Sequence, residues 1–401
     1  MSSRRTFLKT ALRGSSLIAL APTVPGFLAA TARAAAPRRD DRVLVVIQLD
    51  GGNDGINTVV PFQDEGYAKS RKALRLPADR LLKVGESVGF HPGMSEAARL
   101  LERGELAIVQ GVGYPNPSRS HFRSMAVWHS ARPDPEEHAG PGWLGRVFDD
   151  RSASGDRSGA FFLGRGQPPA ALRGRRSTPA TLDRIEDLAL PAKADRPVVE
   201  GGGAANDLAA FVRRGTLDAY ATADRVAEMA RADTSSDRYP ATGLARRLAL
   251  VARLVKSGGD ARVYYTQQGG YDTHAGQLDV HADLLSELFG ALGAFQEDLT
   301  ASGLADRVIA LCFSEFGRRV AENHSGGTDH GTAGPVFLVG RCVRAGLVGP
   351  TPSLLDLDDG DLKSAVDFRR IYATVLQGWL GLTPITPLGG RFELLPLCDV
   401  T

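Results

Sequence analysis

The stretch FSEFGRRVAENHSGGTDHGTAGPVFLVG (313–340) holds Glu315, Asp329 and His330 between two apolar segments. Those segments, 307–313 and 335–340, are short and end in glycine-rich or polar turns, as the strands of a covered parallel sheet do. Polar side chains in such turns either bind a catalytic metal or cap turns of a globular fold. The rest of the chain decides between these two interpretations.

Similar apolar segments and helical patterns alternate along the chain. Three more segments of this kind predict strands, at 42–49, 105–112 and 261–267. Amphipathic patterns predict helices at 91–104, 277–303 and 367–381, the last ending at Gly381 and Pro384. This alternation predicts a doubly wound α/β sheet of mainly parallel strands flanked by helices.

The section 150–260 has a different character. It is rich in glycine, proline and arginine and contains two helical patterns, at 205–232 and 241–257. We interpret it as a helical insertion or cap within a single domain that spans 35–401.

The first residues resemble an export signal. Arg4 and Arg5 precede Phe7, Leu8 and Lys9, and an apolar run at 16–30 and the small-residue pattern ARAA follow. This order predicts a twin-arginine signal over residues 1–34, export by the twin-arginine machinery, and a periplasmic or secreted protein. The alternative is a basic amphipathic helix. The apolar run is short and broken by proline, so we expect no membrane span in the mature protein.

Composition narrows the classes of partner. Removing residues 1–34 removes five basic residues and no acidic ones, leaving 43 basic and 46 acidic residues. No basic stripe with interleaved aromatic residues is present, so nucleic acid is not an expected partner. Three widely spaced cysteines form neither a disulfide framework nor a CxxC metal motif.

Carboxylates and imidazoles gather next to the predicted strands. Ligands of open α/β sheets bind outside the carboxyl ends of the strands, where most of these groups fall. Each group alone could be a turn or capping residue, but together they have the ligand chemistry of a hydrolytic Zn²⁺ or Mn²⁺ site. The candidate metal ligands are Asp50, Asp272, His274, Glu315, Asp329 and His330.

The segment after the strand at 105–112 indicates an anion site. Ser118 and Ser120 precede a helical pattern, and a helix N-terminus attracts anions through its free N–H groups. Arg119 and Arg123 lie one helical turn apart and could contact phosphate or sulfate. A plain serine N-cap is the alternative.

The remaining histidines carry weaker signals. His121, His129 and His138 have no spacing typical of ligands, and the last two are expected on the surface or in packing. His91 is ambiguous, and His281 fits a packed position in the long helix.

Five motifs together resemble an exported bacterial family. It is the family called domain of unknown function 1501, grouped with the alkaline phosphatase-like superfamily of phosphatases and sulfatases. The motifs are QLDGGNDGINTVVP (48–61), NPSRSHFRSM (116–125), GGYDTHAGQ (269–277), FSEFGRR (313–319) and GGTDHGTAGPVFLVG (326–340).

The resemblance implies roles for individual positions. Asp50 matches the metal-binding aspartate that ends the first strand, and Ser118 or Ser120 the nucleophile at a helix start. Asp272 and His274 match an aspartate–histidine pair with shorter spacing than usual, and His330, beside Asp329, matches the last histidine ligand.

Two positions depart from the superfamily pattern. Glu315-Phe316 stands where an aspartate–histidine pair is usual, and phenylalanine cannot bind a metal. Pro115 replaces the nucleophile of the sulfatase element, so a formylglycine mechanism is not expected.

The resemblance therefore implies a hydrolase of phosphate or sulfate esters that uses a divalent metal (Zn, Mn, Ca or Mg) and takes a small anionic ester. The alternative is a superfamily member that has lost catalysis and serves as a periplasmic binding or assembly protein. A third expectation is a carbohydrate- or lipid-binding protein that uses the cap.

Overall fold

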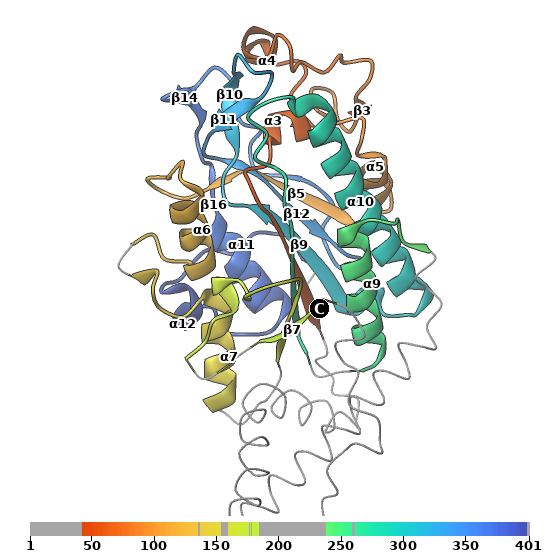
Figure 1. Cartoon of the computed structure of the whole chain (residues 1–401), viewed down its shortest axis with the longest axis vertical. Coiled ribbons are helices and arrows are strands. Elements are labelled where there is room, and N and C mark those ends of the chain that lie inside the picture. Colours follow the sequence, from red (N-terminus) through yellow and green to blue (C-terminus); the bar gives the residue numbers. More distant parts are fainter. Residues whose placement is uncertain are drawn as a thin grey trace, which may run out of the picture.

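A central sheet with helices on both of its faces forms the body of the molecule (Figure 1). The computed structural model describes residues 42–134, 137–153, 159–175, 177, 179–183, 238–258 and 261–398. The predicted signal at 1–34 and the helical pattern at 205–232 lie outside these residues. Within the described part of the chain, no helix combines the length and apolarity needed to cross a bilayer.

The sheet has the strand order β13-β5-β12-β9-β1-β8-β6-β7, and β16 also pairs with β5. All pairs are parallel except those of β12, so the predicted α/β fold with a mainly parallel sheet is confirmed. The strands are β1 (Val43–Leu49), β5 (Leu106–Gly113), β6 (Ala160–Leu163), β7 (Ala180–Leu182), β8 (Val263–Gln268), β9 (Val308–Ser314), β12 (Gly334–Val339), β13 (Gly346–Val348) and β16 (Val366–Asp367).

The direction of β12 corrects one expectation. Its apolar sequence predicts a parallel strand, but it runs antiparallel to both β9 and β5. Only short strands lie between β9 and β12, with no crossover helix to carry the chain back to the first edge. A strand that follows its neighbour without such a crossover runs in the opposite direction.

Alternate residues of β1 bury into two separate apolar layers. Val43, Val45 and Ile47 pack with α5, α9 and α10 on one face of the sheet. Leu44 and Val46 pack with α6, α7 and α11 on the other. The helices are α3 (Gly55–Thr58), α4 (Glu65–Ser70), α5 (Ser95–Glu102), α6 (His121–Ser130), α7 (Trp143–Ala153), α9 (Gly243–Lys256), α10 (Gln277–Ala301), α11 (Phe368–Ala373), the π-helix η7 (Thr374–Trp379) and α12 (Ile385–Leu388).

The described part of section 150–260 belongs to the body of the fold. Strands β6 and β7 extend the central sheet beyond β8, and α9 packs beside α10 (Figure 1). Thr242 caps α9 by accepting a hydrogen bond from the Ala245 N–H. An insertion in this section therefore does not include β6, β7 or α9.

Short strands cover the carboxyl end of the sheet. They form a hairpin of β10 (Arg318–Glu322) with β11 (Thr328–His330), a hairpin of β14 (Leu357–Asp358) with β15 (Asp361–Leu362), and a small sheet of β2 (Val59–Val60), β4 (Gly89–Phe90) and β3 (Leu82–Lys83). A third apolar cluster, which includes Val320 and Leu362, fixes them. The short strands therefore pack on an apolar cluster of their own.

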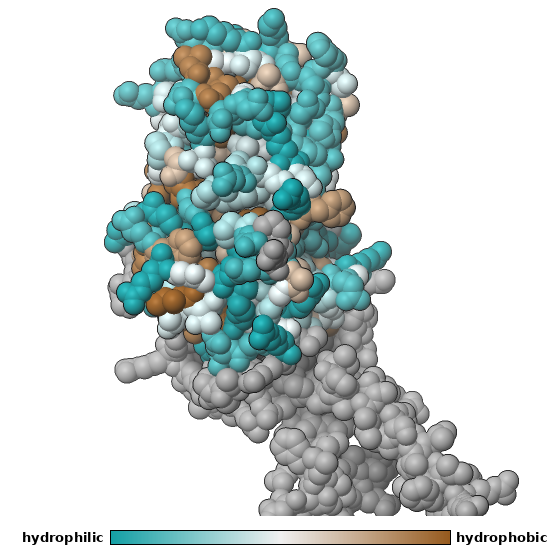
Figure 2. Space-filling view, turned by 90° about the vertical axis from the view of Figure 1, so that its left-hand side faces the viewer, coloured by the Kyte–Doolittle hydropathy of each residue, from teal (hydrophilic) through white to brown (hydrophobic). Residues whose placement is uncertain are grey.

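The face that bears α6 and α7 is mostly hydrophilic. Figure 2 shows this side of the molecule, where hydrophobic side chains occur in small separate groups. A large continuous apolar patch would mark a protein or membrane interface. The visible described surface is instead typical of one that faces water.

Candidate metal site

Three parallel strands deliver acidic residues to one edge of the sheet. In the register of β1, Leu49 lies beside Gln268 of β8 and Ser314 of β9. Asp50, Asp272 and Glu315 follow these strands within a few residues. The carboxyl ends of the three strands therefore bring Asp50 to the same edge as two acidic residues that follow it by more than 200 positions in sequence.

Three imidazole nitrogens converge on one carboxylate oxygen. Asp272 Oδ1 lies 3.0 Å from His274 Nε2, 3.1 Å from His330 Nε2 and 3.5 Å from His121 Nε2. The two nitrogens His274 Nε2 and His330 Nε2 are only 2.8 Å apart. We call these four residues the Asp272 cluster. Ligand atoms of His121, Asp272 and His330 all lie within 4.8 Å of one another.

The other nitrogen of each imidazole is held by an oxygen. His330 Nδ1 lies 2.8 Å from the carbonyl oxygen of Arg119, which can only accept a hydrogen bond. His121 Nδ1 lies 2.8 Å from Glu315 Oε1, and His274 Nδ1 lies 3.3 Å from Asp329 Oδ1. These acceptors place the proton of a neutral imidazole on Nδ1 and leave the Nε2 lone pair facing the cluster. Metal-binding histidines in proteins are commonly oriented in this way.

The arrangement requires positive charge at its centre. With three Nε2 lone pairs and one carboxylate directed at one region, only added protons or a bound cation relieve the repulsion. The hydrogen bond to Glu315 raises the pKa of His121, so this imidazole holds a proton more readily when no cation is present. Three nitrogen donors and one carboxylate suit Zn²⁺ or Mn²⁺ better than the oxygen-rich sets that Ca²⁺ and Mg²⁺ prefer.

Arg318 binds Asp272 from the buried side of the cluster. Its buried guanidinium donates to Asp272 Oδ1 (2.7 Å) and to the carbonyls of Tyr271 and Thr328 (2.8 Å each). Burial raises the pKa of Asp272, but the hydrogen bond from Arg318, together with that from His330 when its Nε2 is also protonated, outweighs burial and lowers this pKa to about 2. Asp272 is therefore ionised near neutral pH.

Glu315 lies one layer behind the cluster. Its buried carboxylate accepts hydrogen bonds from the N–H groups of Gly51 (3.0 Å) and Gly52 (3.3 Å) and from the Ser314 hydroxyl (3.0 Å). Both glycines have positive φ values, 120° and 84°, and a Cβ at Gly51 would collide with the backbone of Asp272. The expected ligand Glu315 thus shapes the loop and orients His121. Asp329 has the corresponding place beside His274.

Asp50 lies outside the set of converging ligand atoms. Its Oδ1 accepts a hydrogen bond from Gln48 Nε2, and Gln48 Oε1 is in turn 2.7 Å from His129 Nε2. Burial is the main cause that raises the pKa of Asp50 to about 6, with a further contribution from the charge of Glu315. The environments of Asp50 and Asp272 therefore separate their pKa values widely, which is typical of acid–base sites.

The raised pKa of Asp50 predicts that replacing this carboxylate by a neutral side chain increases the free energy of unfolding, by an amount that depends on pH. Because the folded chain binds this proton more tightly than the unfolded chain, the contribution of Asp50 to stability is lost as pH rises from about 4 to 6. We expect Asp50→Asn to stabilise the metal-free protein by about 1–3 kcal/mol at pH 8 and to have little effect at pH 4. Urea unfolding at both pH values, with exposed Asp358→Asn as the control, measures this. A gain that is equal at the two pH values would contradict it.

The residues expected to bind an anion occupy different environments. Arg119 is engaged: its Nε lies 2.7 Å from Asp361 Oδ2 and its Nη2 lies 2.8 Å from Asp359 Oδ2. Arg123 is exposed on α6. Ser118 Oγ accepts from the N–H of Ser120 (3.2 Å), whereas the exposed Ser120 is the N-cap of α6 and its side chain makes no capping hydrogen bond.

Phe316 packs against the cluster. Its buried ring lies 4.9 Å, centroid to centroid, from the rings of both His121 and His330. The position at which the superfamily pattern has a histidine thus supplies an apolar wall. Such a wall lowers the local polarity and restricts the two imidazoles.

His121 is the cluster member that the sequence did not indicate. It is the first residue of α6 and comes from a segment about 150 residues before Asp272. Its position after a sheet strand and at a helix start was the available signal, but no spacing distinguished it from His129. His129 and His281 instead make hydrogen bonds to Gln48 and Asn53, away from the cluster.

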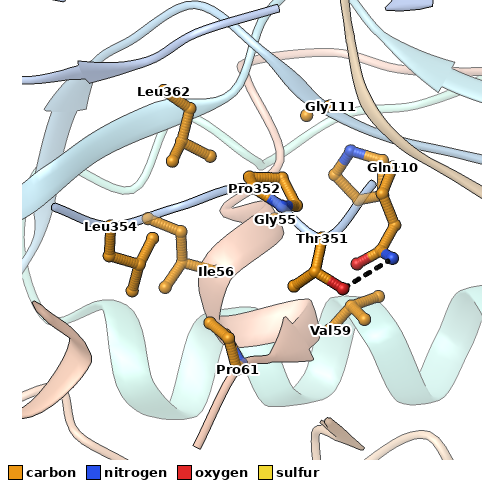
Figure 3. A pocket seen from close by; sticks show the side chains of 12 residues that line it. Gly55, Ile56, Val59, Pro61, Gln110, Gly111, Thr351, Pro352, Leu354 and Leu362 are labelled. Carbon is orange, nitrogen blue, oxygen red and sulfur yellow. Dashed lines mark hydrogen bonds between the residues drawn. The ribbon is translucent and has the colours of Figure 1, made fainter. Parts of the chain in front are cut away.

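An apolar pocket lies elsewhere at this end of the sheet (Figure 3). It is lined by Ile56, Val59, Pro61, Pro352 and Leu354, with Gln110 and Thr351 at one side. Its lining includes no member of the Asp272 cluster and no titratable side chain among the described residues. The converging candidate ligand atoms therefore lie outside this pocket.

Comparisons with known proteins identify a family. The family described as "Protein of unknown function (DUF1501)" matches residues 41–383. A search of the curated proteins finds no match.

Solved structures also match, at low identity. One is a 4S-sulfatase from Bacteroides thetaiotaomicron (12% identity, TM-score 0.39, covering 87% of this chain and 75% of that chain). Others are the zinc complex of the periplasmic domain of EptC from Escherichia coli (10%, 0.38, 76% and 74%) and an alkaline phosphatase superfamily protein from Vibrio parahaemolyticus (9%, 0.36, 85% and 75%).

Proposed function

Because the chain belongs to the DUF1501 family of proteins of unknown function, we propose its activity from the site itself: a metal-dependent hydrolase of phosphate or sulfate esters. One observation carries the proposal. Three imidazoles, each held at Nδ1 by an oxygen, direct Nε2 at the same carboxylate oxygen. The ester class follows from the resemblance of the strand-end motifs to phosphatases and sulfatases.

The Asp272 cluster would hold the cation. His121, Asp272 and His330 provide three ligands, and His274, with a side chain 43% exposed, provides a fourth from the open side. Such an ion supplies polarisation of the ester oxygen and stabilisation of developing negative charge. Arg318 keeps Asp272 ionised, and Phe316 excludes water from one side of the site.

Ser120 is our candidate nucleophile, ahead of Ser118. Its side chain lies at the N-terminus of α6, directly before His121, and makes no capping hydrogen bond. A negatively charged ester would also gain from the positive end of the helix dipole. Asp50, whose pKa is raised to about 6 mainly by burial, would exchange a proton at the same edge of the sheet.

Substitution of the two serines tests this assignment. We expect Ser120→Ala to lower kcat for an aryl phosphate or aryl sulfate by at least about 100-fold, and Ser118→Ala to change it less than about 3-fold. Metal content and thermal unfolding of both variants serve as controls. Equal activity of wild type and Ser120→Ala would reject Ser120 as nucleophile, with the metal site judged separately by its occupancy.

A second candidate function is binding without catalysis. Phe316 occupies the position of a ligand in the superfamily pattern, and the Arg119 guanidinium is engaged by two aspartates. A protein of this kind would bind a metal and an anionic ligand but hydrolyse neither class of ester. Stoichiometric metal together with no turnover of aryl phosphates and sulfates would favour it.

Export completes the proposal. A twin-arginine signal would carry the protein to the periplasm in folded form, with the cluster already formed. Cell fractionation of the wild type and of an Arg4→Lys/Arg5→Lys double variant tests it. Unchanged periplasmic recovery of the variant would contradict twin-arginine export.

A further inference from the structure

Arg119 connects the β14–β15 hairpin directly to a member of the Asp272 cluster. The carbonyl oxygen of Arg119 accepts the hydrogen bond from His330 Nδ1 (2.8 Å), while its guanidinium binds Asp359 and Asp361 of the hairpin. We propose that Arg119 and Asp361 are positioning residues that set the cation affinity of the cluster by orienting His330. This inference rests on the proposed metal site and goes beyond it.

The segment that carries the Arg119 carbonyl has no regular secondary structure. Residues 114–120 form no helix or strand, and Asn116 adopts a positive φ of 55°. Within the segment, the Ser118 N–H donates to the Tyr114 hydroxyl (2.9 Å). The ends of the segment are fixed by the buried Tyr114, whose hydroxyl donates to Ser124 Oγ (3.1 Å), and by the Ser120 carbonyl, which accepts from the Ser124 N–H (2.9 Å). Between these ends, the ion pairs of Arg119 hold the segment against the hairpin.

Asp361 is the more deeply buried of the two aspartates that bind Arg119. Its side chain is only 1% exposed, whereas those of Asp359 and Arg119 are 79% and 39% exposed. A buried carboxylate needs charged partners, and Asp361 has Arg119 and, 3.4 Å away, Arg319 Nε. Exposed ion pairs such as that with Asp359 contribute little by comparison.

The hairpin is held in place by its turn geometry, by apolar packing and by a hydrogen bond. Asp359 and Gly360 both have positive φ values, 49° and 80°, as the two-residue turn of a tight hairpin requires. Leu362 packs in the third apolar cluster and lines the pocket of Figure 3. The Thr332 hydroxyl also donates to the Leu362 carbonyl (2.6 Å), which joins the hairpin to the segment that follows His330.

The effect is specific to one ligand. His121 is oriented by Glu315 and His274 by Asp329, and neither carboxylate contacts Arg119 or Asp361 in the part of the chain that the structure describes. Weakening the hairpin link should therefore loosen His330 most, because the other two imidazoles keep their own carboxylate partners. Removal of an orienting partner typically costs about 10–100-fold in metal affinity.

Calorimetric titration with Zn²⁺ and with Mn²⁺ tests the proposal. We expect Arg119→Gln and Asp361→Asn to weaken binding about 10–100-fold and Arg119→Lys to restore part of it. The control, Asp356→Asn, breaks the exposed Lys363 pair beside the same hairpin and should change affinity less than about 2-fold. Should Asp361→Asn fail to fold, the two Arg119 variants still decide.

A second readout separates positioning from general loss of structure. In ¹⁵N-histidine spectra of the metal-free protein, assigned with His330→Gln, we expect the His330 Nδ1–H signal in the wild type and its loss in Arg119→Gln. A signal that persists in Arg119→Gln overturns the proposal, even when affinity falls, and so does unchanged affinity. If the wild type binds neither ion, the proposed metal function fails. The spectra then test by themselves whether Arg119 orients His330.

Discussion

An Asp272→Asn protein is expected to bind Zn²⁺ or Mn²⁺ at least about 100-fold more weakly than the wild-type chain. Loss of an orienting partner already costs about 10–100-fold, and Asp272 is a candidate ligand itself. Asparagine keeps the shape but removes the charge at the point where three Nε2 atoms converge. Equilibrium competition with a chromophoric chelator measures the change, and loss of ester hydrolysis should accompany it.

A matched control makes this result interpretable. Asp279 is exposed in the first turn of α10, a few residues after His274 in sequence. Asp279→Asn therefore changes the net charge by the same amount without altering a residue of the cluster. Near-ultraviolet circular dichroism shows whether the packing of the aromatic side chains is retained when Arg318 loses its ionised partner. If Asp272→Asn binds metal as the wild type does, the cluster is not the metal site.

The largest expected loss of stability follows removal of Arg71. Its guanidinium lies 2.6 Å and 3.0 Å from the two oxygens of Asp54, and both side chains are fully buried. Although burial raises the pKa of Asp54, the Arg71 charge holds it below its usual value, so the carboxylate is ionised inside the fold. Arg71→Met leaves that charge unpaired and should cost about 3–5 kcal/mol of unfolding free energy.

Urea unfolding at pH 7 measures this loss. Lys69→Ala, which breaks an exposed pair with Glu65 on the same helix, should cost no more than about 0.5 kcal/mol. Adding Asp54→Leu to Arg71→Met should recover part of the stability, because the unpaired charge is removed. A single Arg71→Met variant as stable as Lys69→Ala would contradict this account of the pair.

Much of the sheet could be predicted because its buried strands are continuous apolar runs. Segments 42–49, 105–112, 261–267, 307–313 and 335–340 correspond to β1, β5, β8, β9 and β12. The direction of β12 was wrong, since an apolar run buried on both faces has the same pattern in either direction. Strands β6 and β7 were missed because they are short and lie in a section rich in glycine and arginine.

The candidate site was predictable only where its residues are close in sequence. Asp272 with His274, and Asp329 with His330, stand out as pairs next to strands. His121 did not, because nothing near it in sequence indicates that α6 begins beside β8 and β11. Glu315 and Asp329 carry the chemistry of ligands, but their hydrogen bonds to Gly51 and to His274 place them behind the cluster.

The sequence by itself determined the α/β class, the family and the edge of the sheet at which the candidate ligands gather. Apolar periodicity and strand-end motifs are formed by residues close together in the chain, so they can be recognised from the sequence alone. The tertiary structure decided which groups converge, that the guanidinium of Arg119 is engaged by a hairpin more than 230 residues away, and that His121 belongs to the site. Convergence depends on strand register, loop backbone and hydrogen-bond partners, which only the folded chain brings together.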